Sequence, residues 1–189
     1  MAVLTNAFFD KRVEQLFQLA EILEKAFSSA GIDYRIVGGL AIYLYVETAD
    51  PDAGRLTRDI DIVVRREDLE RIAKAVEPFG LRHRRAAGMD MLVQSEAPSA
   101  RRAVHLVFFG EKVRPDYSEP VPKIGSYETV RTLRVIPLPD LVRMKLTSFR
   151  AKDETHIRDL DDAGLITPEI ETTLPAVLRE RLAATRARE

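Results

Sequence analysis

Two stretches of sequence decide the fold of this chain: Val37-Gly38-Gly39-Leu40-Ala41 and, after a loop, Leu56-Thr57-Arg58-Asp59-Ile60-Asp61-Ile62-Val63-Val64. In the first stretch, a short strand over residues 34–37 is expected to run into two glycines and then into a buried helix over residues 40–46. Glycine lets the backbone approach a ligand closely, and a helix N-terminus offers unpaired N–H groups and a positive dipole. The order of strand, glycine pair and helix therefore predicts a phosphate cradle, although a glycine pair alone is more often a tight turn.

The second stretch places two carboxylates on one face of a strand. Side chains alternate along residues 58–64, so Asp59 and Asp61 point to the same side, away from the apolar face. Two like charges there repel each other, and the arrangement makes sense when a cation lies between them. Carboxylate oxygens suit Mg²⁺, which also takes waters and substrate phosphates. A solvated strand face with Arg58 as the counter-charge is the alternative, and it is the commoner explanation for such a pair taken alone.

Taken together, the two stretches resemble the DNA polymerase β-like nucleotidyltransferase superfamily, in particular its small bacterial members of the minimal and abortive-infection-toxin type. The resemblance covers about residues 30 to 110 in order and weakens toward about residue 165. It implies that Gly38 and Gly39 bind the triphosphate of a nucleotide and that Asp59 and Asp61 bind Mg²⁺ or Mn²⁺. The implied reaction is attack of an acceptor on the α-phosphorus, with release of pyrophosphate, between two metal ions. Arg58 is a further candidate for nucleotide binding.

The sequence departs from the family pattern at His105. The family places a third carboxylate on a neighbouring strand, and the matching stretch here, residues 103–109, has His105 at that position. Imidazole is a poor ligand for Mg²⁺. His105 is therefore interpreted as a general base near neutral pH, as a ligand for Mn²⁺, or as a half-buried strand histidine without a chemical role. The missing carboxylate is otherwise sought at Asp90, Glu111 or Asp116, and the spacing selects none of them.

A second polar group lies in the C-terminal region. Lys145 falls inside an apolar helical stripe, so its ammonium either reaches out to water or points into a cleft toward an anion. The family resemblance implies the second role, because a lysine on such a helix contacts the triphosphate in toxin-type members. Asp153, His156 and Asp159 are interpreted as part of an ion-paired helix surface.

Composition excludes several classes of protein. The chain has 189 residues, of which 46% are hydrophobic, enough for one well-buried core. A formal net charge of -1 gives no general case for a nucleic-acid or membrane surface. The absence of cysteine excludes disulfides and thiolate metal sites, and three histidines make a multi-histidine zinc site implausible. No apolar run approaches the roughly 20 residues that span a bilayer, and a cytoplasmic location is expected.

The order of the expected elements predicts an α+β fold: a nucleotidyltransferase-type mixed β-sheet flanked by helices, with a C-terminal helical segment. An amphipathic helix is expected to begin near Asn6 and to stop at Gly31. We expect a core over residues 1–137, with residues 138–189 packed on it in a single compact unit. Further helices are expected over residues 67–78, 140–150, 154–163 and from 175 onward, and further strands over 81–85, 89–94, 103–109 and 131–136. The strands over 89–94 and 103–109 are expected to form a hairpin, joined by a loop that contains Glu96, Pro98 and Ser99.

The expected partners are a nucleoside triphosphate, an RNA, protein or small-molecule acceptor, and a cognate antitoxin or toxin, with no membrane. Contact with RNA phosphates is one interpretation of two arginine groups, and solvated charge on an edge strand is the commoner one. The groups are Arg82, Arg84 and Arg85, and Arg101 and Arg102. The alternative function is a catalytically degenerate nucleotidyltransferase fold that acts as a nucleotide sensor or as a toxin–antitoxin component, because His105 replaces the third carboxylate.

Overall fold

The computed structural model describes residues 2–55, 57, 59–96 and 103–188. Within these residues, seven strands form one mixed sheet in the order β3-β4-β5-β2-β1-β7-β6. Strand β2 lies in the middle, antiparallel to β1 and parallel to β5. The sheet is therefore mixed, as the sequence predicts. The strands are β1 Tyr34–Val37, β2 Ile60–Val64, β3 Leu81–Ala86, β4 Met89–Gln94, β5 Val104–Phe108, β6 Glu128–Val130 and β7 Leu133–Val135.

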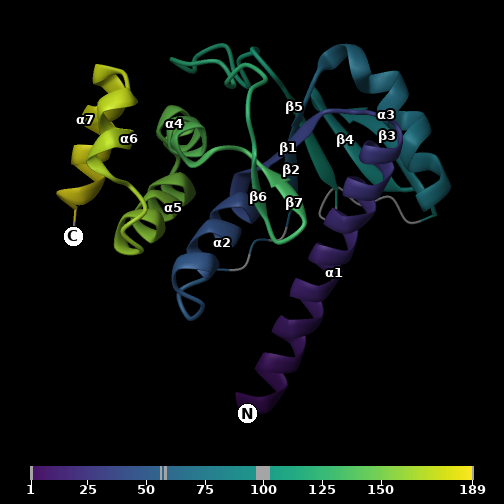
Figure 1. Ribbon diagram of the computed structural model, residues 1–189, viewed down its shortest axis with the longest axis horizontal. Coiled ribbons are helices and arrows are strands. Elements are labelled where there is room, and N and C mark those ends of the chain that lie inside the picture. The colour runs from purple at the N-terminus through teal and green to yellow at the C-terminus, as the bar shows by residue number, and fades with distance from the viewer. Residues whose placement is uncertain (1, 56, 58, 97–102, 189) are drawn as a thin grey trace.

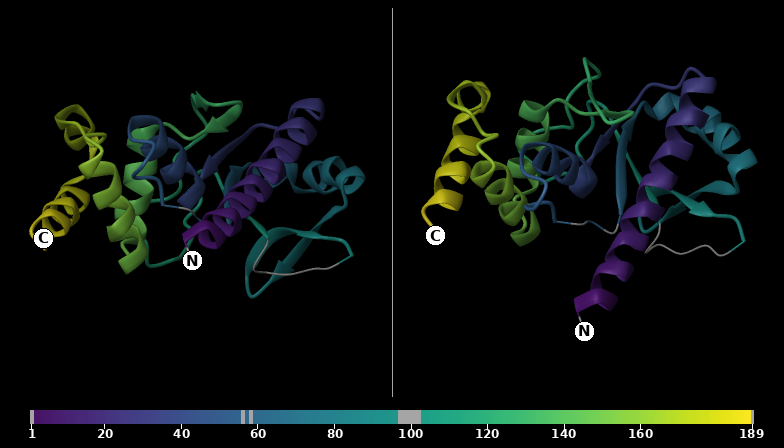
Figure 2. Two further views of the ribbon diagram at one scale, coloured as in Figure 1. Left: turned by 90° about the horizontal axis from the view of Figure 1, so that it is seen from below. Right: turned by 60° about the horizontal axis from the view of Figure 1, so that its bottom comes forward.

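Helices pack around the sheet, and several of them lie beyond one end of it. The helices after β7 gather at one end of the molecule, and α3 lies at the other end beside β3 (Figure 1). The views in Figure 2 show the same separation. The helices are α1 Ala2–Ser29, α2 Gly38–Ala49, α3 Leu69–Val76, α4 Leu138–Ser148, α5 Ala151–Asp162, α6 Pro168–Thr173 and α7 Ala176–Arg186, with 3₁₀ turns η1 Arg66–Asp68 and η2 Glu77–Phe79 on either side of α3.

The first helix packs its apolar stripe against the sheet. Leu16, Ala20, Leu23 and Phe27 are buried at helical spacing, and the Phe27 ring meets Tyr34 of β1 edge-on with 5.1 Å between centroids. The helix ends at Ser29, ahead of Gly31 with a φ of +61°, so the predicted stop is confirmed. Its start was wrong, because α1 begins at Ala2, ahead of Asn6.

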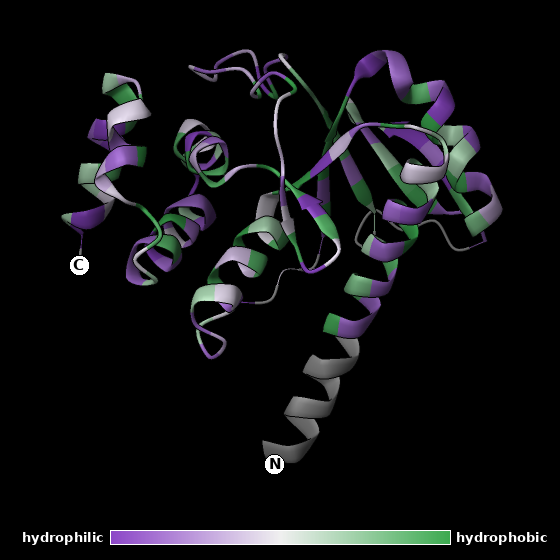
Figure 3. Ribbon diagram, in the orientation of Figure 1, coloured by the Kyte–Doolittle hydropathy of each residue, from purple (hydrophilic) through white to green (hydrophobic). Residues whose placement is uncertain are grey.

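The centre of the molecule is apolar on both sides. In β2, Ile60 and Ile62 are buried on one face and Val63 on the other, and α2 is buried from Gly39 to Val46. Figure 3 shows hydrophobic residues through this central region, whereas α5 is largely hydrophilic. Within the part of the chain that the structure describes, no helix is both long and apolar enough to cross a membrane.

Local turns account for the differences from the predicted elements. The strand predicted over residues 131–136 is confirmed as β7, with shorter bounds, because Arg131 has a φ of +56° and lies in the turn that joins β7 to β6. Strand β6 was not predicted. A second hairpin joins β3 to β4 through Ala87 and Gly88, both with positive φ, as a two-residue hairpin turn requires. The predicted hairpin of β4 with β5 is confirmed by their antiparallel pairing, and Pro98 and Ser99 of its loop lie outside the described residues. Helix α6 was not predicted.

Candidate active site

The register of the sheet brings the candidate residues together. Asp61 of β2 lies directly opposite Val37 of β1 on one side and His105 of β5 on the other. Val37 immediately precedes Gly38, so Asp61 lies between the glycine pair and His105. Asp59 lies just before β2, two residues away on the same strand face, and both aspartates are half-buried.

The glycine pair is required by close approach as well as by conformation. Gly38 has a φ of +69°, and a Cβ at this position would lie 2.0 Å from Asp61 Oδ2. A Cβ on Gly39 would lie 2.5 Å from Thr57 Oγ1. Helix α2 begins at Gly38 without a side-chain cap and without an acidic residue in its first turn. Neither an N-cap side chain nor a first-turn acid therefore satisfies its first N–H groups, which suits an external phosphate.

His105 contacts the candidate metal ligand itself. Its Nδ1 lies 3.1 Å from Asp61 Oδ1, and three quarters of the His105 side chain is buried. The hydrogen bond to Asp61 raises the pKa of His105 above its usual value, with burial opposing and the charges of Asp61 and Asp59 assisting. His105 therefore stands on the strand beside the aspartates, at the place where the family resemblance implies a third carboxylate.

Of the other acidic residues considered for that place, two are engaged elsewhere and one is exposed. Asp90 lies opposite Leu106 in the antiparallel pair, so it points to the other face of the sheet from His105, and it bonds His83 Nε2 at 2.8 Å. Glu111 accepts a two-pronged bond from Arg66 at 2.6 and 2.7 Å. Asp116 is exposed.

The oxygen ligands that this site offers to a cation such as Mg²⁺ are fewer than a complete protein site would supply. No group of three or more histidine, cysteine or acidic side chains able to hold a metal ion occurs among the residues that the structure describes. Two carboxylates on one strand, Asp59 and Asp61, nevertheless match a Mg²⁺ ion that takes its remaining ligands from water and substrate phosphates.

A pocket of about 120 Å³ opens in front of Asp61 and Gly38. We call it the cleft pocket. One part of its lining is polar, and the rest is mostly apolar. The polar part includes Asp61, Glu119, Lys145, Thr147, Ser148 and Arg150, and the apolar part includes Val37, Val107, Val113, Tyr117, Pro120, Val121, Leu141 and Met144. Cationic and apolar side chains in one lining suit a ligand with an anionic end and an apolar body.

Lys145 reaches this pocket from α4 instead of extending into water. It is only 7% exposed, and its Nζ lies 3.1 Å from Asp153 Oδ1. Burial lowers the pKa of Lys145, while Asp153 and Asp61 act in the opposite direction. Asp153 and His156 are also buried, so interpreting them as a helix surface was wrong. Asp159 pairs with Arg55 at 2.9 Å, as an ion-paired helix would predict.

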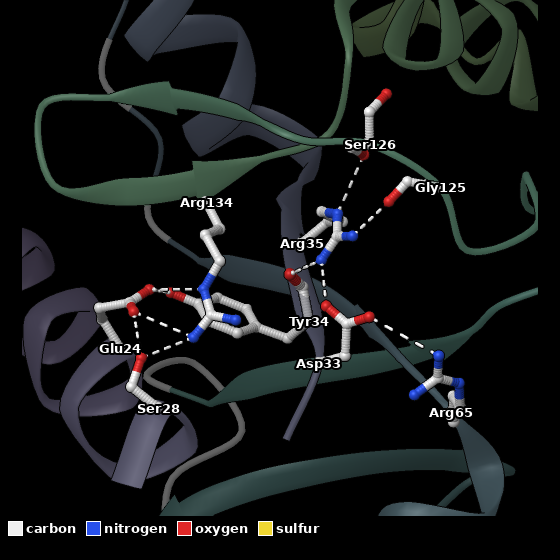
Figure 4. A network of polar contacts seen from close by, with 9 residues as sticks. All are labelled: Glu24, Ser28, Asp33, Tyr34, Arg35, Arg65, Gly125, Ser126 and Arg134. Atoms are coloured by element: carbon white, nitrogen blue, oxygen red, sulfur yellow. Dashed lines mark hydrogen bonds and ion pairs between the residues drawn. The ribbon is translucent and has the colours of Figure 1, made fainter. Parts of the chain in front are cut away.

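Part of the apolar wall of the cleft pocket, including Tyr117 and Val121, belongs to a segment that β1 anchors. Residues 110–127 leave β5, carry Tyr117 and Val121, and close on themselves through the bonds Gly110 N to Val121 O at 3.0 Å and Val121 N to Glu111 O at 2.8 Å. Figure 4 shows the guanidinium of Arg35 donating to the carbonyls of Gly125 and Ser126 at the end of this segment.

Arg35 is held in that position by its own neighbours. The side chain is 3% exposed, pairs with Asp33 at 2.5 Å and donates to the Tyr34 carbonyl at 2.7 Å, and its charge lies 4.8 Å from the Tyr127 ring centroid. Asp33 also pairs with Arg65 at 3.6 Å. Sequence analysis missed Arg35, and an arginine inside the buried strand 34–37 was the only signal for it.

Some predicted residues do not join the site. Arg58 lies outside the described residues, as do Arg101 and Arg102. Arg82, Arg84 and Arg85 are exposed on β3, the edge strand of the sheet.

Solved structures share this fold. The antibiotic-resistance factor ANT(2'')-Ia superposes with a TM-score of 0.56 at 15% identity, over 94% of this chain and 94% of its own. A nucleotidyltransferase-like protein from Paracoccidioides brasiliensis gives 0.58 at 19% identity, over 93% and 89% of the two chains. The Megavirus polyadenylate synthase gives 0.56 at 10% identity, over 87% of this chain and 36% of its own. None of the curated proteins compared matches the chain.

The sheet and these superpositions show that the chain has a nucleotidyltransferase-like fold. A family model described as "Nucleotidyl transferase AbiEii toxin, Type IV TA system" matches residues 21–189. The chain belongs to this AbiEii family.

Proposed function

We propose that the protein is a metal-dependent nucleotidyltransferase that transfers a nucleoside monophosphate from a nucleoside triphosphate to an acceptor. One observation carries the proposal: Gly38 at the start of α2, Asp61 of β2 and Lys145 of the distant helix α4 line one pocket. A glycine-led helix N-terminus and a buried lysine attract phosphate, and a carboxylate opposite them attracts a divalent cation. Family membership supports nucleotide transfer as the reaction class.

Each group has a distinct task in this mechanism. The N–H groups of Gly38 and Gly39 and the ammonium of Lys145 hold the phosphates, and the apolar wall around Tyr117 receives the nucleoside. Asp59 and Asp61 hold Mg²⁺ or Mn²⁺, which supplies charge neutralisation at the phosphates. The acceptor oxygen forms a bond to the α-phosphorus, and the bond from that phosphorus to the pyrophosphate oxygen breaks.

His105 takes the proton of the acceptor. If Nδ1 donates to Asp61 Oδ1 across the 3.1 Å contact, Nε2 keeps a free lone pair. An imidazole oriented in this way by a carboxylate is suited to general-base catalysis near neutral pH.

The same contact also favours a second candidate function, a nucleotide sensor that binds without transferring. An imidazolium on Asp61 competes with a cation for that carboxylate. The two functions are separated by His105→Asp. If His105 is a working base, the variant loses transfer of labelled nucleotide. A gain of transfer over the wild type means that the natural site is degenerate and that the protein is a sensor.

The acceptor and the protein partner are proposed at the level of class. The acceptor is an RNA, a protein or a small molecule, and labelled nucleotide incubated with each class identifies it. A cognate antitoxin is the proposed protein partner, because the family description places its members in type IV toxin–antitoxin systems.

Thermal unfolding with each ribonucleoside triphosphate, in Mg²⁺ or in Mn²⁺, tests the function directly. At a ligand concentration 100 times the dissociation constant, binding stabilises the native state by about 2.7 kcal/mol, which raises Tm by several degrees. We expect the shift in the wild type and in the control Asp52→Ala, an exposed turn residue, and no shift in Asp59→Ala/Asp61→Ala. No shift with any nucleotide and metal in the wild type would overturn the proposal.

A further inference from the structure

One carboxylate behind the cleft pocket is bonded to three residues of its polar lining. Asp153, in the first turn of α5, is 1% exposed. It accepts hydrogen bonds from Lys145 Nζ at 3.1 Å, Ser148 Oγ at 2.8 Å and Arg150 Nε at 2.7 Å. All three donors line the pocket, whereas Asp153 does not. Side chains at the end of α4 and in the turn before α5 are thus fixed by a single buried carboxylate.

The charges of this group are unequal. Lys145 and Arg150 bring two positive charges to the one carboxylate of Asp153, so this group keeps a net positive charge. The acidic residues of the pocket lining are Asp61 and Glu119. Asp61 of β2 lines the same pocket and its charge acts on Lys145, whereas His156 of α5 does not line the pocket. A pocket that places a net cationic group opposite a candidate metal ligand is arranged for a polyanion bridged by a cation.

Removing the carboxylate would change Lys145 most. Burial lowers the pKa of this lysine, and the charge of Asp153 is the largest influence in the other direction. Arg150 keeps its charge regardless, because a guanidinium does not lose its proton in proteins. Burial alone would raise the pKa of Asp153, but the bonds from Arg150 and Ser148 and the charge of Lys145 hold it well below its usual range.

We propose that Asp153 is a positioning residue, which keeps Lys145 charged and directed, together with Arg150, at the triphosphate end of the cleft pocket. This inference rests on the proposed nucleotide-binding function. Asp153 touches no substrate itself, and it acts through the two cations that do.

Asp153 also has a structural role that the test must separate. Its Oδ2 accepts a bond from the Arg150 backbone N–H at 3.3 Å and so caps α5. Loss of such a cap costs about 1 kcal/mol. Asp153→Asn retains the shape and an acceptor oxygen but removes the charge, and Asp161→Asn is the matched control, because Asp161 lies on the same helix and pairs with Arg186 at 2.7 Å outside the pocket.

The first readout is the affinity of the full chain for a nucleoside triphosphate and for inorganic tripolyphosphate, measured by calorimetry from about pH 6 to about pH 9. We expect Asp153→Asn to bind both about tenfold or more weakly, with a loss that grows as pH rises and Lys145 gives up its proton. The wild type and Asp161→Asn should show no such trend. A capping role alone would lower Tm without this dependence on pH.

The second readout is rescue. Lys145→Arg in the Asp153→Asn background should remove the pH dependence, because the guanidinium stays charged. If folded Asp153→Asn binds both probes like the wild type at every pH, the positioning role is wrong while the proposed function stands. Binding that depends on Asp153 without any nucleotide transfer would overturn the function but keep the role. A wild type that binds neither probe overturns both.

Discussion

The carboxylate of Asp61 lies against the backbone of Gly38, so that a Cβ on Gly38 would come 2.0 Å from Asp61 Oδ2. No side chain fits between the start of α2 and this carboxylate. The position of the proposed metal ligand and the position of the proposed phosphate cradle are therefore fixed by one contact, and a change at Gly38 alters both.

Gly38→Ala is expected to disrupt the site beyond its cost to the backbone. Gly80 is the matched control, because its φ of +73° is similar and a Cβ there meets nothing within 4 Å. Both alanine variants should lose about 1–2 kcal/mol of stability from the left-handed conformation. Only Gly38→Ala must also displace Asp61, so it alone should lose the metal-dependent thermal shift with nucleotide. If Gly38→Ala and Gly80→Ala lost equal stability and Gly38→Ala kept the thermal shift with nucleotide, the close contact between Gly38 and Asp61 would be contradicted.

Arg35→Lys is expected to weaken substrate binding through the wall of the cleft pocket. Lysine keeps the charge but cannot reach the Gly125 and Ser126 carbonyls together, so residues 110–127 lose their anchor. We expect a loss of about 2 kcal/mol in stability and a rise in KM with little change in kcat. The measurements are urea unfolding and steady-state kinetics.

The control for this change is Arg71→Lys. Arg71 likewise donates to two backbone carbonyls, those of Ala30 and Gly31, at 2.7 and 3.2 Å, and it lies away from the pocket. Its loss should lower stability without moving KM. A KM that rises equally in both variants would mean that the effect is general destabilisation.

The His105–Asp61 pair should contribute stability on the acidic side of neutrality. The folded pKa of His105 is raised above the ordinary 6.5, so the folded state holds the proton more tightly than the unfolded state. The contribution is fully present below about pH 6.5 and is lost as pH rises through the raised pKa. In metal-free buffer, the wild type should exceed His105→Gln in unfolding free energy near pH 5.5 and approach it near pH 9. A difference that does not change with pH, or one that persists in the Asp61→Asn background, would show that the pair is not its source.

Local patterns predicted where the two aspartates and the glycine pair lie, and the family resemblance supplied their proposed roles. Asp59 and Asp61 share a face because strands have a period of two, and Gly38 ends a strand and begins a helix within a few residues. Asp90 could not be placed from sequence, because its face depends on the register between β4 and β5. Register is set by contacts between distant segments, which one sequence does not display.

The burial of charged side chains was the second feature that could not be predicted from the sequence. Helix α5 has a mostly hydrophilic sequence, which predicts an exposed helix, yet Asp153 is buried because Lys145 and Arg150 compensate its charge. Arg35 raises the same difficulty, since the carbonyls that satisfy it lie about ninety residues away along the chain. A polar residue can be predicted as buried only when its partners are known.

His156 should make the protein sensitive to acid. Burial, and next the charges of Lys145 and Lys152, lower the pKa of His156 to about 4, and within the described chain its Nδ1 has no hydrogen-bond partner. The unfolded chain takes up this proton near pH 6.5 and the folded chain only near pH 4, so between these values the unfolded state binds more protons and stability falls as pH falls. Replacement by Met, similar in volume and without a titrating group, should remove this loss. From pH 7 to pH 4, the wild type should lose up to about 3 kcal/mol more than His156→Met in urea unfolding. Parallel loss in both proteins would mean that carboxylates alone govern the acid response and that the His156 side chain finds a proton acceptor or solvent in the folded state.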